Sequence, residues 1–75
     1  MERLTAADFE GTTLSRDGTL AVTFSAKWCP YCRDFMAEFK KTELSVEKAM
    51  GDVTDEGSAL WDDFKLNVVP TMVLF

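Results

Sequence analysis

Histidine is absent from the 75-residue sequence, and cysteine occurs only twice, at Cys29 and Cys32. Two cysteines cannot build the multi-bridge framework that holds many small secreted domains together. A structural zinc ion takes four ligands, most often cysteine and histidine. A closed zinc site within one chain would therefore have to recruit carboxylates. A metal ion shared between two chains stays open as an alternative, and we expect no metal centre.

Basic residues are also scarce, with eight Lys and Arg against thirteen Asp and Glu and a net charge of −5. Nucleic-acid binding needs clustered Lys and Arg, so no nucleic-acid partner is expected. No apolar run is long enough to cross a bilayer, and Met1–Glu10 lacks the pattern of a secretory signal. We expect a single cytoplasmic domain over residues 1–75 that does not associate with a membrane.

The first part of the chain contains a capping pattern. Thr5 and Asp8 are spaced as in a capping box, which predicts the start of a short helix with Phe9 and Leu14 as its apolar anchors. A turn is expected at residues 16–18, where glycine follows two charged residues.

A strand and a helix are predicted on either side of the cysteines. Thr19–Ser25 is rich in β-branched and aromatic residues, which favours a strand. After the cysteines the apolar period changes to that of a helix ending near Thr42. The shared face of the strand would consist of Leu20, Val22 and Phe24, and the apolar stripe of the helix of Cys32, Phe35, Met36 and Phe39.

The remaining pattern is less regular until the last eight residues. Residues 44–50 suggest one or two helical turns, 52–54 a short strand, and 55–58 a loop. A short helix would then bury Leu60, Trp61 and Phe64. Residues 68–75 are apolar on both faces, as in an inner strand. Alternation of strands and helices predicts an α/β fold with parallel pairing.

The spacing of the two cysteines predicts redox chemistry. If Cys29 stands at the start of the helix, Pro30 occupies the first helical position, which needs no N–H donor. Cys32 then lies one turn further, on the same side, where the two sulfurs can form a disulfide. Free N–H groups and the positive end of the helix dipole stabilise a thiolate at Cys29, and Lys27 and Arg33 add positive charge. Cys29 is therefore the expected attacking sulfur.

Cys32 has the complementary role in this interpretation. On the buried stripe it should stay protonated until it resolves the mixed disulfide formed by Cys29. The alternative, two buried structural cysteines, fits poorly with Trp28 and Pro30 around an exposed helix start.

These segments together resemble the thioredoxin family. LTAADFE, DGTLAVTFSAKWCPYC and FKLNVVPTMVLF occur in the order of the family, and the pairing of WCxxC with a later VPT is specific. The resemblance implies a thioredoxin fold with a central mixed β-sheet flanked by helices. It also implies that Pro70 follows a cis bond and faces the cysteines, and that the Val69 backbone binds extended substrate. Trp28 would help form the docking surface, although it could instead be a packed core aromatic.

Three departures from the family pattern are visible. Thr23 stands where the family usually has a buried aspartate that accepts the proton of the second cysteine. Pro30-Tyr31 between the cysteines is the glutaredoxin dipeptide, which we expect to make the couple more oxidising. The chain ends where the family continues into another strand and a closing helix, so we expect an incomplete domain that associates through its uncovered sheet edge.

The resulting prediction is a protein thiol–disulfide oxidoreductase that needs no cofactor. Its site residues would be Cys29 and Cys32, supported by Trp28, Pro30, Tyr31, Val69 and Pro70. Its partners would be protein disulfides, with an external reductase or glutathione as electron donor. Two alternatives stay open: a glutaredoxin-like glutathione-dependent reductase, and a non-catalytic module that binds peptides or a metal.

Overall fold

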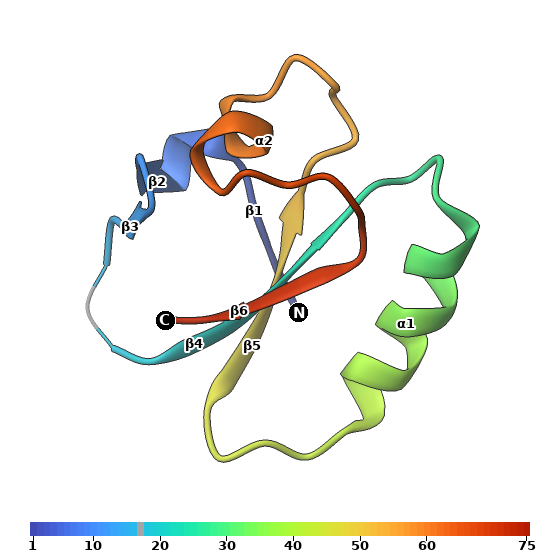
Figure 1. The fold of residues 1–75 in the computed structure, drawn as a ribbon. Coiled ribbons are helices and arrows are strands. Elements are labelled where there is room, and N and C mark those ends of the chain that lie inside the picture. Colours follow the sequence, from blue (N-terminus) through green and yellow to red (C-terminus); the bar gives the residue numbers. More distant parts are fainter. Residues whose placement is uncertain (17) are drawn as a thin grey trace.

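A four-stranded mixed sheet forms the centre of the computed structural model, which describes residues 1–16 and 18–75. The strand order is β1-β5-β4-β6, in which β1, β5 and β4 are parallel and β6 is antiparallel to β4 (Figure 1). The bounds of these strands are Glu2–Leu4 (β1), Leu20–Ser25 (β4), Glu47–Asp52 (β5) and Thr71–Leu74 (β6). The predicted mixed α/β architecture is therefore confirmed.

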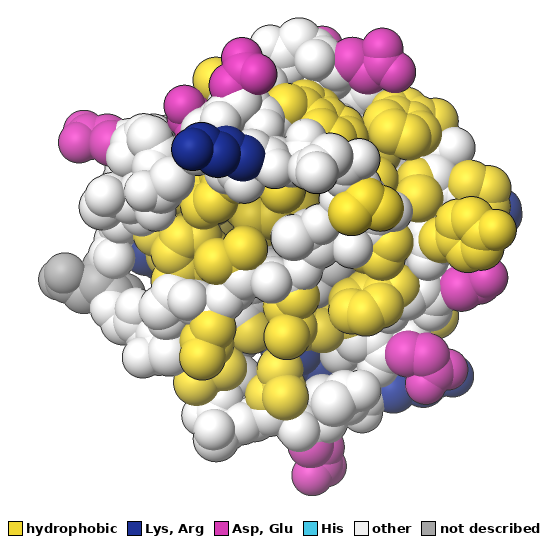
Figure 2. All heavy atoms as spheres, in the orientation of Figure 1, with side chains coloured by type: hydrophobic (Ala, Val, Ile, Leu, Met, Phe, Trp, Pro, Cys, Tyr) yellow, Lys and Arg dark blue, Asp and Glu magenta, His cyan; other side chains and the backbone are white. Residues whose placement is uncertain are grey.

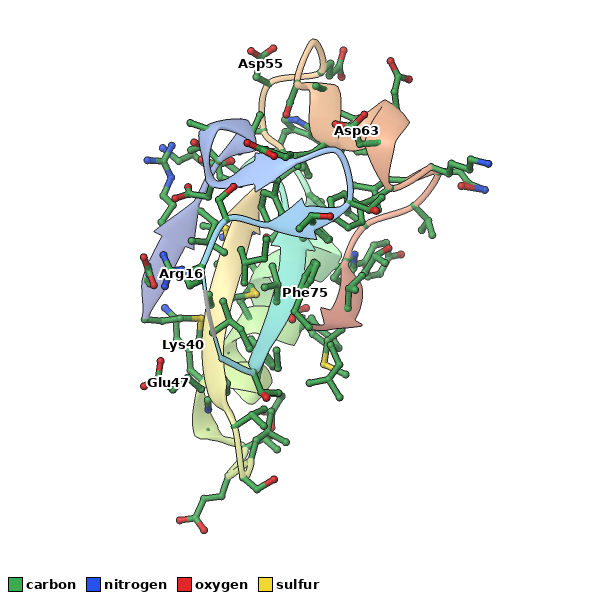
Figure 3. The ribbon with its side chains drawn as sticks, turned by 90° about the vertical axis from the view of Figure 1, so that its left-hand side faces the viewer. Arg16, Lys40, Glu47, Asp55, Asp63 and Phe75 are labelled. Atoms are coloured by element: carbon green, nitrogen blue, oxygen red, sulfur yellow. The ribbon has the colours of Figure 1, made fainter. Side chains whose placement is uncertain are left out.

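Helix α1 (Pro30–Lys41) covers one face of the sheet, and three smaller elements cover the other. Figure 3 looks onto one face of the sheet, with the two-stranded hairpin in front of it and α1 behind it. These smaller elements are a 3-10 helix, η1 (Ala6–Asp8), the hairpin of β2 (Phe9–Glu10) and β3 (Thr13–Leu14), and the short helix α2 (Ala59–Asp63).

Strand β4 lies in the interior because both of its faces are covered. All six of its residues are buried, as expected for a strand with helices or loops on either side. As predicted, Leu20, Val22 and Phe24 belong to the core cluster. The Phe24 ring packs against Phe9 and Phe64, with ring centroids 6.1 and 4.8 Å apart. Truncating such a buried ring typically costs about 3–5 kcal/mol.

Gly51 of β5 provides the space for this ring. It pairs with Phe24 across the two strands, and a Cβ added at position 51 would lie 2.5 Å from Phe24 Cδ1. That distance is far inside van der Waals contact, and overpacking of a core costs about 1–3 kcal/mol. Glycine is therefore required here by close packing.

The N-terminal segment differs from the helix expected there. Thr5 and Asp8 do cap a helix, since the Thr5 N–H donates to Asp8 Oδ2 at 2.9 Å. The helix ends after Asp8, however, and Phe9 and Leu14 pair in the β2–β3 hairpin. Extended backbone at Phe9 sends its ring into the core beside Phe24. The turn expected at residues 16–18 includes Asp17, which lies outside the described residues.

The helical turns expected over residues 44–50 are also wrong, because β5 occupies Glu47–Asp52. The short strand expected at 52–54 is the end of this longer one. β5 has no β-branched residue, but it pairs with β1 on one side and β4 on the other. The pairing of β5 with a strand on each side outweighs the weak preference of its residues for strand structure.

Strand β6 has the apolar pattern of an inner strand but lies at the edge of the sheet within the described part of the chain, so this sheet edge is uncovered, as expected. Its residues alternate between partly buried and exposed, so Met72 and Leu74 are more than half exposed. On α1 the predicted stripe is buried only at Cys32 and Phe39, while Phe35 is 39% exposed and Met36 is half-buried.

Candidate active site

The two cysteines lie at the start of α1, as the sequence predicted. Cys29 is the N-cap residue and Pro30 occupies the first turn. The Cys29 sulfur accepts a hydrogen bond from the Cys32 N–H at 3.2 Å. One of the free N–H groups of the helix start is thus directed at the first sulfur.

Both thiols are free and both are shielded from solvent. Cys29 is 7% exposed and Cys32 only 1% exposed, so the exposed part of the helix start consists of Trp28, Pro30 and Tyr31. Burial raises the pKa of the Cys32 thiol, and the neighbouring Cys29 sulfur acts in the same direction. Ser25 and the Ala26 backbone oppose this shift without cancelling it. Burial and the Cys29 sulfur therefore both favour the protonated form of Cys32.

The segment before β6 meets the first sulfur. The Val69–Pro70 peptide bond is cis, as the family resemblance implied. The Cys29 thiol donates to the Val69 carbonyl oxygen, with sulfur and oxygen 3.6 Å apart. Residues 40 positions apart in the sequence thus join in one site. Val68, one residue earlier, is 68% exposed, and its carbonyl accepts from the Thr71 hydroxyl at 2.6 Å.

Trp28, the residue before Cys29, contacts a second tryptophan. Its indole is 50% exposed and stacks on Trp61 of α2, with ring centroids 6.2 Å apart and planes inclined by 11°. Its Nε1–H donates to the Thr54 carbonyl at 2.9 Å. Trp28 is therefore a surface aromatic with one face covered. The sequence indicated Trp61 only as a core residue of a short helix and gave no sign of this stack.

Asp52 is a partly buried carboxylate near Cys29 that the sequence did not single out. Its Oδ2 accepts from Arg3 Nε at 2.7 Å, and its Oδ1 accepts from the Thr54 N–H at 2.9 Å. Burial alone would raise its pKa, but the hydrogen bonds from Thr54 and the Arg3 guanidinium outweigh this effect. The pKa of Asp52 consequently lies below its usual range.

A pocket of about 330 Å³ opens beside Cys29 at this end of the sheet. Its lining includes Ser25, Lys27, Arg33 and Asp52. The two cations that the sequence placed around the cysteines do lie there. The pocket therefore brings solvent and positive charge close to the first cysteine.

Thr23, which stands in place of the usual aspartate, is completely buried in β4. Its hydroxyl oxygen has no hydrogen-bond partner among the described residues. A threonine hydroxyl cannot accept a proton at neutral pH. Any proton leaving Cys32 must therefore go to another acceptor.

Apolar side chains extend from this site over the neighbouring surface. Figure 2 shows them covering much of the face over β6 and toward the start of α1. The large exposed ones include Trp28, Tyr31, Val68 and Met72. Across residues 1–16 and 18–75 there is no cluster of three or more Cys, Asp and Glu side chains suited to a metal ion. In the same residues no helix is both long enough and apolar enough to span a bilayer.

Comparison with known proteins agrees with this architecture. The family model of thioredoxin matches residues 1–75, so the chain belongs to the thioredoxin family. No curated protein sequence matches it. The fold is a thioredoxin fold, and its two neighbouring cysteines fit the redox function that is general in this family.

Proposed function

We propose that the protein is a thiol–disulfide oxidoreductase that reduces disulfide bonds in other proteins. The Cys29 thiolate attacks one sulfur of a substrate disulfide, forms a mixed disulfide and releases the other substrate sulfur as a thiolate. Cys32 then gives up its proton and attacks the Cys29 sulfur. This step forms the Cys29–Cys32 disulfide and releases the second substrate thiol, so two electrons pass from the protein to the substrate.

The observation that carries this proposal is the unequal placement of the two sulfurs on α1. Cys29 caps the helix and accepts the Cys32 N–H at 3.2 Å, while Cys32 is 1% exposed. A nucleophile benefits from donors directed at its negative charge. A resolving thiol benefits from staying protonated, and the raised pKa of Cys32 supports this role.

Substrate would dock where Trp28, Tyr31 and the segment before β6 surround Cys29. The Val69 carbonyl is close to the attacking sulfur, and an extended peptide can pair with backbone groups of such a segment. Apolar exposure at Trp28 and Val68 provides contact area without charge. We propose protein disulfides as the substrates and an external reductase or glutathione as the electron donor.

Insulin reduction with dithiothreitol as reductant tests the activity. The wild-type protein should accelerate the reaction over the rate with dithiothreitol alone. Cys29→Ser should abolish this acceleration because no attacking sulfur remains. Cys32→Ser is the matched variant, since it makes the same change at the other sulfur. It should slow turnover to the rate at which dithiothreitol resolves the mixed disulfide. With insulin alone, in the absence of dithiothreitol, it should accumulate that mixed disulfide through Cys29, which mass spectrometry detects. Acceleration of insulin reduction by Cys29→Ser equal to that by the wild type would refute the mechanism.

The glutathione alternative predicts a different outcome. A monothiol route needs only the first cysteine, so removal of glutathione from a mixed disulfide should survive Cys32→Ser. If that variant deglutathionylates a peptide at the wild-type rate while the wild type reduces insulin poorly, the chemistry is glutaredoxin-like. If neither disulfide substrate reacts with the wild type, the protein is a binding module.

A further inference from the structure

We propose that Trp61 is a positioning residue of the active site, which fixes the Trp28 indole as a substrate platform beside Cys29. This inference rests on the proposed function and identifies a residue far from the cysteines in sequence that sets substrate affinity. The contacts of the two indoles with each other and with one loop carry it.

The stack is close to parallel. The ring planes of Trp28 and Trp61 differ by 11°, and their centroids are 6.2 Å apart. Aromatic pairs at such separations attract each other beyond the effect of buried area alone. Trp61 thereby covers one face of the Trp28 ring, while half of the Trp28 surface stays open to a ligand.

Both indoles also donate hydrogen bonds to the loop between β5 and α2. Trp28 Nε1–H donates to the Thr54 carbonyl at 2.9 Å. Trp61 Nε1–H lies 3.2 Å from the carbonyl oxygens of Val53 and Asp55, the residues on either side of Thr54. Three consecutive carbonyl groups thus face two indole donors. The loop and the two rings form one unit, which we call the indole clamp.

Backbone hydrogen bonds connect the indole clamp to the segment that carries the catalytic cysteine. The N–H of Lys27, which precedes Trp28, donates to the Thr54 hydroxyl at 2.9 Å. The Cys29 N–H, which follows Trp28, donates to the Ala26 carbonyl at 3.2 Å. The backbone on both sides of Trp28 is therefore held, and the stack with Trp61 determines where the exposed ring points.

A platform held in place binds better than a mobile one. An exposed tryptophan that must be immobilised by each substrate loses side-chain freedom at every binding event. Trp61 removes that cost before substrate arrives. Its loss should therefore raise KM for a protein substrate and leave kcat unchanged, because the sulfur chemistry does not involve the indoles.

Three variants separate this role from a general effect on stability. Trp61→Leu removes both the stack and the N–H donor, whereas Trp61→Phe keeps an aromatic ring. Phe64→Leu is the matched control. Phe64 is a partly buried aromatic three residues further along, but its ring contacts Phe9, Phe24 and Phe75.

The kinetic readouts are insulin reduction and reduction of the small disulfide DTNB, which needs no extended docking surface. Trp61→Leu should raise KM for insulin about three- to tenfold, the range expected for loss of a stacked aromatic pair. Its kcat for insulin and its rate with DTNB should stay within twofold of wild type. Trp61→Phe should show a smaller rise in KM, and Phe64→Leu should show none.

Circular dichroism gives an independent signature of the clamp. Two stacked indoles at this distance couple their electronic transitions, and an in-plane rotation of one ring relative to the other then produces a paired positive and negative band. This couplet should be present in wild type and in Phe64→Leu, and absent from Trp61→Leu and Trp28→Phe.

The results that would overturn the inference are distinct from failure of the proposed function. Turnover by wild type with an unchanged KM in Trp61→Leu refutes the role of Trp61 alone. An equal rise in KM for Phe64→Leu also refutes it, because general loosening would then explain both. A wild type that reduces neither substrate overturns the proposed function and this inference with it, even if the couplet is present.

Discussion

The hydroxyl of Thr23 is the least satisfied polar group of the buried core. It lies in β4 with both faces covered, and its oxygen has no hydrogen-bond partner among the residues described. A buried polar group without a partner costs about 1–3 kcal/mol. Threonine here thus lacks the proton-accepting carboxylate that is usual in the family, and its unpartnered hydroxyl also weakens the fold.

Replacing Thr23 with valine should therefore stabilise the protein. Valine has nearly the same shape and removes only the unpartnered hydroxyl, so the free energy of unfolding should rise by about 1–3 kcal/mol. Urea denaturation of both proteins measures the change. The same substitution at exposed Thr13 of β3 is the control and should stay within about 0.5 kcal/mol. Destabilisation by Thr23→Val would show that the hydroxyl is in fact bonded.

The raised pKa of Cys32 links folding of the reduced protein to alkaline pH. The folded state keeps the thiol proton at pH values where the unfolded chain has already lost it. The unfolded chain then binds fewer protons, so stability falls as pH rises. This contribution is complete below the ordinary thiol pKa of about 8.5 and is lost as pH rises through the higher folded value.

Urea unfolding of the reduced protein at increasing pH measures this loss. Cys32→Ala has no titrating group at position 32 and should show a shallower decline. Equal declines in the two proteins would mean that Cys32 is not the source.

At the scale of elements, a side chain of β5 satisfies backbone carbonyl groups at the C-terminal end of α1. The Lys48 ammonium of β5 donates to the carbonyls of Phe39, Lys40 and Thr42 at 2.7–2.8 Å. The last carbonyls of a helix have no partners within it and carry partial negative charge. One cation from the neighbouring strand therefore satisfies the end of α1 opposite the cysteines.

Substitution of Lys48 by methionine tests this capping. The variant keeps an unbranched side chain but loses all three hydrogen bonds, so we expect a loss of about 1–2 kcal/mol in unfolding free energy. Lys41→Met removes a charge from the exposed last turn of the same helix and should have a smaller effect. Equal stability of Lys48→Met and wild type would contradict the capping role.

At the scale of the whole molecule, Arg3 and Asp52 join the N-terminal strand to the end of the sheet that holds the candidate active site. The lowered pKa of Asp52 makes this tie dependent on pH. The folded state keeps the carboxylate ionised at pH values where the unfolded chain takes up a proton. Its stabilising effect is therefore present above the unfolded pKa of about 3.9 and is lost as pH falls through the lower folded value.

Asp52→Asn should accordingly lower stability at neutral pH and make the decline in acid less steep. Thermal unfolding from neutral to acidic pH measures both effects. Asp63→Asn, at an exposed position of α2, makes the same change where the structure shows no ion pair for the carboxylate within the described residues and should leave the profile unchanged. A wild-type acid profile in Asp52→Asn would refute the proposed tie.

Sequence reasoning succeeded where the signal was local. Cys29 as N-cap, Pro30 in the first turn and the end of α1 at Thr42 follow from neighbours within one helix. It failed for β5, whose residues have weak strand preference and are held by β1 and β4. It also missed the contacts of Trp61 with Trp28, of Asp52 with Arg3 and of Lys48 with the end of α1, because these partners come from distant segments that only the folded chain brings together.

The two faces of β4 are covered by different numbers of buried side chains. On one side four phenylalanine rings, those of Phe9, Phe24, Phe64 and Phe75, contact one another. On the other, α1 buries only Cys32 and Phe39. Transient opening should therefore cost less on the α1 side of β4 than on the phenylalanine side, and amide protons of α1 should exchange with solvent sooner than those of β4. Such brief openings would give the second sulfur a way to release its proton to water without any resident base.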